Sequence, residues 1–201
     1  LARRADVAPS TASGHLRALV EGGLVSVAVD GRRREYRLAS ADIAEALEAL
    51  GRVCPRSAVR SLRGSQEAAR LDFARTCYDH LAGRVGVAIL DGLLEAVWIA
   101  PAGTRYVLGP EGKRFGELGI DVDALRRQRR RFARPCIDGT ERRPHLAGAL
   151  GAALCRVVLD RGWFVRNVHG RGLRLTGRGA TELERLLGIE LPVPSRPAIA
   201  G

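Results

Sequence analysis

The feature that most constrains the fold is an internal repeat in the second half of the chain. One copy reads R-T-C-Y-D-HLAG over Arg75–Gly83, and the other reads R-P-C-I-D-GTERRP-HLAG over Arg134–Gly148. Six additional residues separate the Asp from the His in the second copy. A repeat of this kind indicates one supersecondary unit that is built twice and buries its apolar face against its own copy.

The two copies continue to match beyond HLAG. The matching positions are Gly86 with Gly151, Ala88 with Ala153, Trp98-Ile99 with Trp163-Phe164, Tyr106–Leu108 with Leu173–Leu175, Gly112 with Gly179, and Leu118–Ile120 with Leu187–Ile189. Each copy predicts a helix from HLAG onward, a strand led by an aromatic residue, a hairpin, a return strand and a closing helix, for which Thr176 is an N-cap in the second copy. The pattern therefore predicts two degenerate winged-helix-like repeats, residues 75–120 and 134–189, packed about a pseudo-twofold axis.

The first forty residues carry a different, self-contained pattern. Pro9–Glu21 predicts a helix, because Ala12, Leu16 and Leu19 recur at helical spacing and proline is tolerated in a first turn. Gly22-Gly23 supplies the left-handed conformation that ends helices. The opposite face holds small or hydrogen-bonding residues, which allow a helix to approach base edges in the major groove: Ser10, Thr11, Ser13, Gly14 and Arg17.

A basic β-hairpin is predicted directly after this helix. Leu24–Val29 predicts a strand, Asp30-Gly31 a tight turn, and Arg33–Leu38 the return strand. The tip carries Arg32, Arg33 and Arg34, side chains that suit contact with phosphates or with the minor groove. A helix followed by such a hairpin is typical of a winged helix-turn-helix.

By the words LARRADVAPSTASGHLRALVEGGLV and GRRREYRL, the chain resembles the ArsR-type winged-helix repressors over roughly residues 1–50. The resemblance implies a homodimer that binds an inverted repeat of double-stranded DNA with its recognition helices in successive major grooves. It implies DNA contacts from Ser10, Thr11, Ser13, His15, Arg17, Arg32, Arg33 and Arg34. Metal-sensing members carry a cysteine-rich motif before the turn, and Leu1–Val7 contains no cysteine, so that thiolate site is not expected here.

These patterns define the expected organisation of the chain. Ser40 is a predicted N-cap for a helix through Leu50, which in this family often contributes to the dimer. We expect a DNA-binding domain over residues 1–50, a linker over 51–64, a C-terminal effector domain over 65–191 and a loose tail over 192–201. The expected fold class is mainly α with small β-hairpin wings (α+β).

The charge favours a nucleic-acid partner. The formal net charge is +11 and the pI is near 10.9, and Lys113 is the single lysine among 33 basic residues. A GC-rich genome would raise the arginine count but not the excess of positive over negative charge. The run Arg126–Arg134 is predicted to be helical, either as a solvated face or as a second surface that contacts phosphates.

The repeat retains the same chemically versatile side chains in both copies: Cys77, Asp79 and His80, then Cys136, Asp138 and His145. A Cys77/His80/Cys136/His145 set would suit Zn(II), although the Cys-to-His spacing differs between the copies. The alternatives are an organic-effector pocket without metal, or a structural core with local Arg75–Asp79 and Arg134–Asp138 ion pairs. Cys155 is expected in the core, as are Trp98 and Trp163.

No catalytic motif accompanies these residues. The P-loop, GxSxG, HExxH and dinucleotide-binding fingerprints are absent, so we expect a non-enzyme, with a Cys77/His80 thiol nucleophile as the minor alternative. No apolar run spans a bilayer and no signal peptide is evident, so we expect a bacterial cytoplasmic protein. The chain lacks methionine, and we expect its natural N-terminus to precede Leu1.

The sequence thus predicts a dimeric repressor released or modulated by a small-molecule or metal effector in its C-terminal domain. The alternative is a winged-helix interaction module, or a nonspecific nucleic-acid-binding module, without effector sensing.

Overall fold

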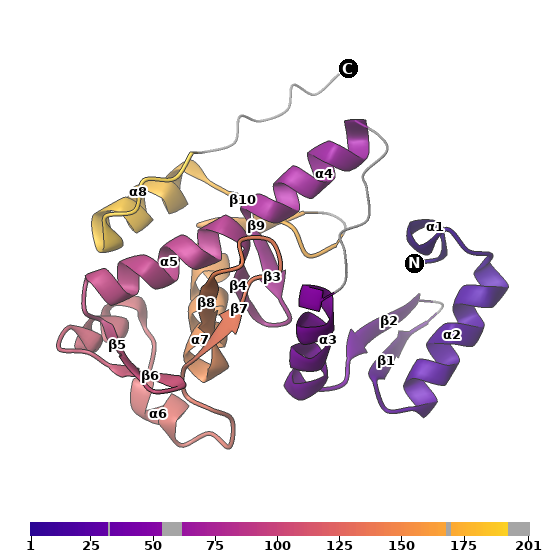
Figure 1. The fold of residues 1–201 in the computed structure, drawn as a ribbon, viewed down its shortest axis with the longest axis horizontal. Helices are drawn as coiled ribbons and strands as arrows, with labels where there is room; N and C mark the ends of the chain where they lie inside the picture. The colour runs from indigo at the N-terminus through magenta and orange to yellow at the C-terminus, as the bar shows by residue number, and fades with distance from the viewer. Residues whose placement is uncertain (32, 54–61, 168–169, 193–201) are drawn as a thin grey trace. The chain divides into compact units, whose positions relative to one another are not determined.

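The computed structural model describes residues 1–31, 33–53, 62–167 and 170–192. The chain divides into two compact units, Leu1–Cys54 and Pro55–Gly201, each of which is considered by itself. The fold is mixed α and β, and every sheet in the described ranges is a two-stranded antiparallel hairpin (Figure 1).

The first unit is a helical pair, a hairpin and a third helix. Its elements are α1 (Ala2–Ala5), α2 (Pro9–Glu21), β1 (Val25–Asp30), β2 (Arg33–Leu38) and α3 (Ala41–Val53). Pro9 opens α2, where its missing N–H leaves no partner unsatisfied. Gly23, at φ 69°, follows the helix in the left-handed region. The Ser40 hydroxyl accepts a hydrogen bond from the Ile43 amide at 3.2 Å, as the predicted N-cap requires.

Two local predictions in this unit are wrong in detail. The inward stripe of α2 is Ala12, Leu16 and Val20, which are half-buried, whereas Leu19 is 37% exposed. At about 100° per residue, Val20 lies about 40° from Leu16 around the helix and Leu19 about 60° from it on the other side, so Val20 is nearer to the centre of the inward face. In the hairpin, Asp30 pairs with Arg33, so Asp30 belongs to strand β1 rather than to the predicted Asp30-Gly31 turn. Arg32 lies outside the described residues.

The second unit presents the same order of elements twice: a helix, a hairpin, a long helix, a second hairpin and a closing helix. The first series is α4 (Leu62–Phe73), β3 (Arg75–Cys77), β4 (His80–Ala82), α5 (Gly83–Glu95), β5 (Ile99–Ala102), β6 (Arg105–Leu108) and the 3₁₀ helix η1 (Gly112–Leu118). The second is α6 (Val122–Arg126), β7 (Arg134–Ile137), β8 (Pro144–Ala147), α7 (Gly148–Asp160), β9 (Phe164–Arg166), β10 (Leu173–Leu175) and α8 (Gly177–Leu187).

Several boundaries in the second unit differ from the sequence-based expectation. The helices after HLAG begin at the glycine, and the HLA residues form strands β4 and β8, because they pair with the Cys-containing strands. Only Arg126 of the run Arg126–Arg134 is helical; bends follow, and Arg134 begins β7. Helix α3 continues to Val53 and α4 begins at Leu62, so both ends of the range 51–64, which was predicted as a linker, are helical. Cys54 and the tail from residue 193 lie outside the described residues.

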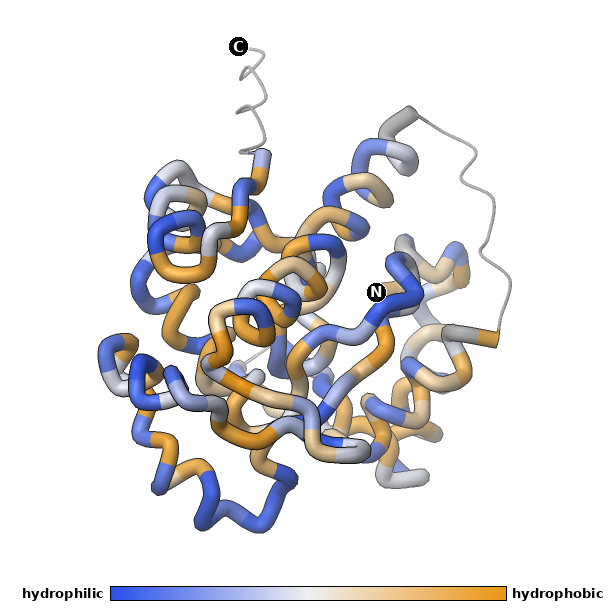
Figure 2. The backbone as a smooth tube through the Cα atoms, turned by 60° about the vertical axis from the view of Figure 1, so that its left-hand side comes forward, coloured by the Kyte–Doolittle hydropathy of each residue, from blue (hydrophilic) through white to orange (hydrophobic). Residues whose placement is uncertain are grey.

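One apolar core joins the two series in the second unit. Trp98 and Trp163 directly precede β5 and β9 and are each at most 2% exposed, as expected for core residues. Cys155 is buried in the same core. In Figure 2, orange and blue segments alternate along the helices, the pattern of amphipathic helices with one face turned to a core. The Thr176 hydroxyl accepts from the Gly179 amide and thereby starts α8, as predicted.

Candidate functional site

The candidate DNA-contacting residues of α2 lie on its solvent-exposed side. Ser10, Thr11, Ser13, His15 and Arg17 are all exposed, whereas the apolar stripe of the same helix faces the unit. The Ser13 hydroxyl donates to the Pro9 carbonyl at 2.9 Å. Its proton is therefore used within the helix, and its oxygen can still accept a hydrogen bond from another molecule. The face can therefore offer one guanidinium, one imidazole and several hydroxyl groups to a base edge.

The hairpin brings Arg33 and Arg34 to the start of its return strand, next to the loop. Both side chains are exposed. Asp30 lies opposite Arg33 in the register, and Glu35 pairs with Arg37 at 3.1 Å. Glu35 thus offsets Arg37, and the positive charge of the hairpin lies chiefly near its loop, at Arg33 and Arg34.

The positive charge of the chain is unevenly divided. Residues 1–54 contain eight arginines and seven carboxylates, so nearly all of the net charge of +11 belongs to the second unit. A unit that is almost neutral attracts polyanions only weakly, so any DNA binding by this unit would depend on specific contacts from its exposed faces.

In the second unit, two short hairpins each deliver one cysteine and one histidine to the same place. Cys77 pairs directly with His80 across β3–β4, and Cys136 pairs with His145 across β7–β8. The six-residue insertion of the second copy lies in the loop of its hairpin, so the different spacing in sequence produces the same register in space. The two copies therefore present equivalent Cys–His pairs.

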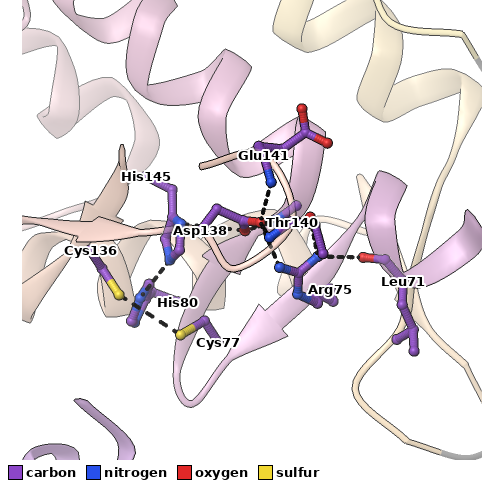
Figure 3. A network of polar contacts seen from close by, with 10 residues as sticks. Leu71, Arg75, Cys77, His80, Cys136, Asp138, Thr140, Glu141 and His145 are labelled. Carbon is purple, nitrogen blue, oxygen red and sulfur yellow. Dashed lines mark hydrogen bonds and ion pairs between the residues drawn. The ribbon is translucent and has the colours of Figure 1, made fainter. Parts of the chain in front are cut away.

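The two Cys–His pairs converge on one buried point (Figure 3). The Nε2 atoms of His80 and His145 are 3.2 Å apart, and the Sγ atoms of Cys77 and Cys136 are 4.0 Å apart. The four ligand atoms all lie within 4.8 Å of one another. Each of the four residues is at most 7% exposed.

Glycines on the two long helices allow this convergence. A Cβ at Gly86 on α5 would lie 2.7 Å from the Leu81 carbonyl oxygen and 3.5 Å from Cβ of His145. A Cβ at Gly151 on α7 would lie 2.4 Å from the Leu146 carbonyl oxygen and 3.4 Å from Cβ of His80. Each histidine thus packs against the helix of the other copy, at a position where only glycine fits.

A carboxylate lies on the Nδ1 side of each histidine. His80 Nδ1 is 3.2 Å from Asp79 Oδ1, and His145 Nδ1 is 3.6 Å from Asp138 Oδ2. The second distance exceeds a hydrogen bond, and His145 Nδ1 has no hydrogen-bond partner in the described part of the chain. Carboxylates in this position orient an imidazole and select its tautomer, which leaves Nε2 directed at the cluster.

Arginines hold both carboxylates, and they come from the opposite copy. Arg75 donates to Asp138 at 2.7 Å, and Arg130 donates to Asp79 at 2.6 Å. The predicted local Arg75–Asp79 pair is therefore wrong, because Arg75 pairs with Asp138 and Asp79 pairs with Arg130. Two further residues of this network were not predicted from the sequence. Thr140 donates from both its amide and its hydroxyl to Asp138. Arg130 could be suspected only from its place in the arginine run.

Hydrogen bonding keeps both aspartates ionised. Burial alone would raise the pKa of Asp138, but donors from Thr140, Gly83 and Glu141 outweigh it and hold this pKa well below its usual range. Burial opposes ionisation of Asp79 as well, and hydrogen bonds with His80 and Arg130 lower its pKa to about 2.

The cluster also favours the thiolate form of one cysteine. The contact with Cys77 lowers the pKa of the Cys136 thiol, burial opposes that change, and His145 and His80 reinforce it. Burial would lower the pKa of His80, but Asp79 and Cys136 raise it above its usual value. The cluster thus stabilises the thiolate, which is the nucleophilic and metal-binding form of cysteine. All four side chains are shielded from solvent, which disfavours the thiol-nucleophile alternative.

Comparison with known proteins provides the family. The chain is 43% identical over 192 residues to a Bacillus subtilis (strain 168) protein named "Uncharacterized HTH-type transcriptional regulator YdfF", covering 95% of this chain and 85% of the relative. No protein-family profile matches the chain, and no solved structure matches it. None of the described helices is long and apolar enough to cross a membrane. With this identity over nearly its whole length, the chain belongs to the HTH-type transcriptional regulators.

Proposed function

We propose that this regulator is a dimeric, ArsR-type repressor that binds an operator in double-stranded DNA and is released or modulated by an effector bound in its second unit. The observation that carries the proposal is the exposed polar face of α2, followed at once by a hairpin with arginines beside its loop. That combination matches the arrangement by which winged helices read DNA.

The two elements divide the work of recognition. On α2, the guanidinium of Arg17 can donate two parallel hydrogen bonds, and the hydroxyl-bearing side chains are short. Both kinds of side chain suit contact with base edges in the major groove. Arg33 and Arg34 lie at the start of the return strand, where they can contact phosphates. We therefore assign sequence choice to α2 and electrostatic affinity to the hairpin.

Helix α3 supports the dimer. Leu47, Leu50 and Val53 recur on this helix and are 49%, 59% and 78% exposed. An apolar stripe of this kind is costly to leave in water and is typical of a helix that packs against another chain. A second copy of the same helix is the occupant that we propose, since twofold pairing buries the same stripe on both chains.

The second unit supplies the effector-binding role. Its buried core contains ionisable and thiol side chains that a purely structural core has no need to retain, because buried polar groups cost free energy unless they are fully paired. Their convergence from two copies of one pattern supports a ligand-binding role for this unit.

Selection of binding sites from a random DNA library, followed by mobility-shift titration, tests the proposal. We expect an inverted repeat whose half-sites are about one helical turn apart, bound by two chains and at least a thousandfold more tightly than random DNA. Equal affinity for selected and random DNA would overturn the proposal and favour a nonspecific or protein-interaction module.

A further inference from the structure

We propose that Cys77, His80, Cys136 and His145 form a four-coordinate binding site for Zn(II) or a cation of similar softness. Two thiolates and two imidazoles are the ligand set that Zn(II) accepts in closed sites, and all four residues are buried here.

The distances between ligand atoms suit a tetrahedral ion. With Zn–N near 2.0 Å and Zn–S near 2.3 Å, tetrahedral angles require about 3.3 Å between two nitrogens and about 3.8 Å between two sulfurs. The observed separations are 3.2 Å between the histidine Nε2 atoms and 4.0 Å between the cysteine Sγ atoms. The widest separation in the set is at most 4.8 Å, against about 3.5 Å for an ideal N–S edge, so binding of the ion would draw these atoms together by up to about 1.3 Å.

The surroundings of the cluster complete the design of a metal site. Asp79 and Asp138 lie on the Nδ1 side of the two histidines, as carboxylates do when histidine binds a metal through Nε2. Each carboxylate is fixed in turn by an arginine from the other copy. His145 Nδ1, buried and without a hydrogen-bond partner among the described residues, lies where a small closure would bring it onto Asp138.

The site is closed, which limits its role. Four protein ligands fill a tetrahedral shell and leave no position for water or substrate, so the ion would have a structural role rather than a catalytic one. Because β3–β4 and β7–β8 each contribute one thiolate and one imidazole, an ion would fasten one copy to the other. If the effector role of this unit is correct, loss of the ion would weaken the contact between the two copies; this last step alone rests on the proposed function.

The test is metal analysis of the purified chain of 201 residues. We expect about one zinc per chain by inductively coupled plasma mass spectrometry, with less than a tenth of that in Cys136→Ser and His145→Ala. Cys155→Ser is the matched control, since this thiol is equally buried but lies outside the cluster, and it should keep the full content. Circular dichroism establishes that each variant is folded.

Cobalt binding gives a readout that does not depend on metal acquired during expression. Co(II) added to the apo chain should produce the strong visible bands of a tetrahedral site and a thiolate charge-transfer band, which weakens in Cys77→Ser. Asp79→Asn should lower the affinity for Co(II) about 10–100-fold, and Asp91→Asn, whose partner is the exposed Arg143, should not. A folded, fully reduced wild-type chain that binds neither zinc nor cobalt overturns the site, as does a Cys77–Cys136 disulfide in the protein as isolated.

Operator binding separates the two proposals. If zinc binds but a chelator leaves operator affinity unchanged, the metal site stands and the ion is not the effector. If the chain binds no metal but an organic ligand releases the operator, the metal site falls and the proposed function stands.

Discussion

Arg75 and Asp138 form a fully buried ion pair between the two halves of the second unit, with 2.7 Å between Nη2 and Oδ1 and side chains that are 5% and 0% exposed. The same carboxylate accepts from the Gly83 amide at the start of α5 and lies behind His145. One side chain therefore links a strand of the first copy, a helix start and the Cys/His cluster.

Loss of one member of this pair should destabilise the second unit. We expect Arg75→Met to lower the free energy of unfolding by about 3–5 kcal/mol, because it leaves Asp138 charged, buried and without its guanidinium partner. Urea denaturation followed by tryptophan fluorescence measures this change specifically, since Trp98 and Trp163 both lie in the second unit. A chelator in the buffer removes any contribution from bound metal.

The control for this variant is Arg143→Met. Arg143 pairs with Asp91 at 2.9 Å, but those side chains are 58% and 44% exposed, so the loss should be below about 1 kcal/mol. Similar losses for both variants would mean that the backbone and Thr140 donors alone sustain the Asp138 carboxylate.

The thiol of Cys155 should be unreactive in the native state. Burial raises its pKa to about 11, so at pH 8 only about one molecule in a thousand carries the thiolate. We expect iodoacetamide to leave Cys155 unlabelled for hours at pH 8 and to label it quickly in urea, as peptide mass spectrometry would report. Fast labelling of native protein would contradict its placement in the core.

The elements set by local patterns were predictable from the sequence. Pro9, Gly22-Gly23, Ser40 and Thr176 act through their own neighbours along the chain, and each begins or ends a helix as expected. The matching Cys, Asp and His residues of the repeat also identified the cluster, because retention of one polar set in two copies is visible without a structure.

The contacts between the copies were not predictable. Strands β3 and β4 have three residues each and are buried throughout, so they show none of the alternation that identifies a strand. The ion pairs join residues more than fifty positions apart, whereas sequence spacing favoured neighbours four apart. The unequal Cys–His spacing argued against a common site until the hairpin register placed the insertion in a loop.

Arg17 should determine sequence preference. If its guanidinium reads a base from the exposed face of α2, Arg17→Ala will weaken operator binding by about 1–3 kcal/mol and leave binding to random DNA nearly unchanged. Arg34→Ala, on the hairpin, should instead weaken binding to both DNAs alike. An equal loss on both DNAs for Arg17→Ala would place Arg17 on a phosphate, and fluorescence anisotropy at fixed salt distinguishes the outcomes.

The exposed stripe of α3 should hold the dimer. Leu50→Glu places a charge within that stripe, and we expect light scattering after gel filtration to report a single-chain mass where the wild type reports two chains. Val29→Glu, on the hairpin and 66% exposed, should leave the mass unchanged. A wild-type monomer, or a Leu50→Glu dimer, would remove α3 from the interface.

The arginines after α6 should contribute to DNA affinity without contributing to specificity. The second unit carries nearly all of the net positive charge, and Arg127 and Arg129 are exposed in the turn and bends that follow α6. If both contact phosphates, Arg127→Gln/Arg129→Gln will reduce the slope of log affinity against log salt by roughly 1–2, for operator and random DNA alike. Arg174→Gln/Arg178→Gln removes the same charge from another exposed part of the unit and should alter the slope by much less. If both double variants keep the wild-type slope, the run is a solvated face and the salt dependence arises in the first unit.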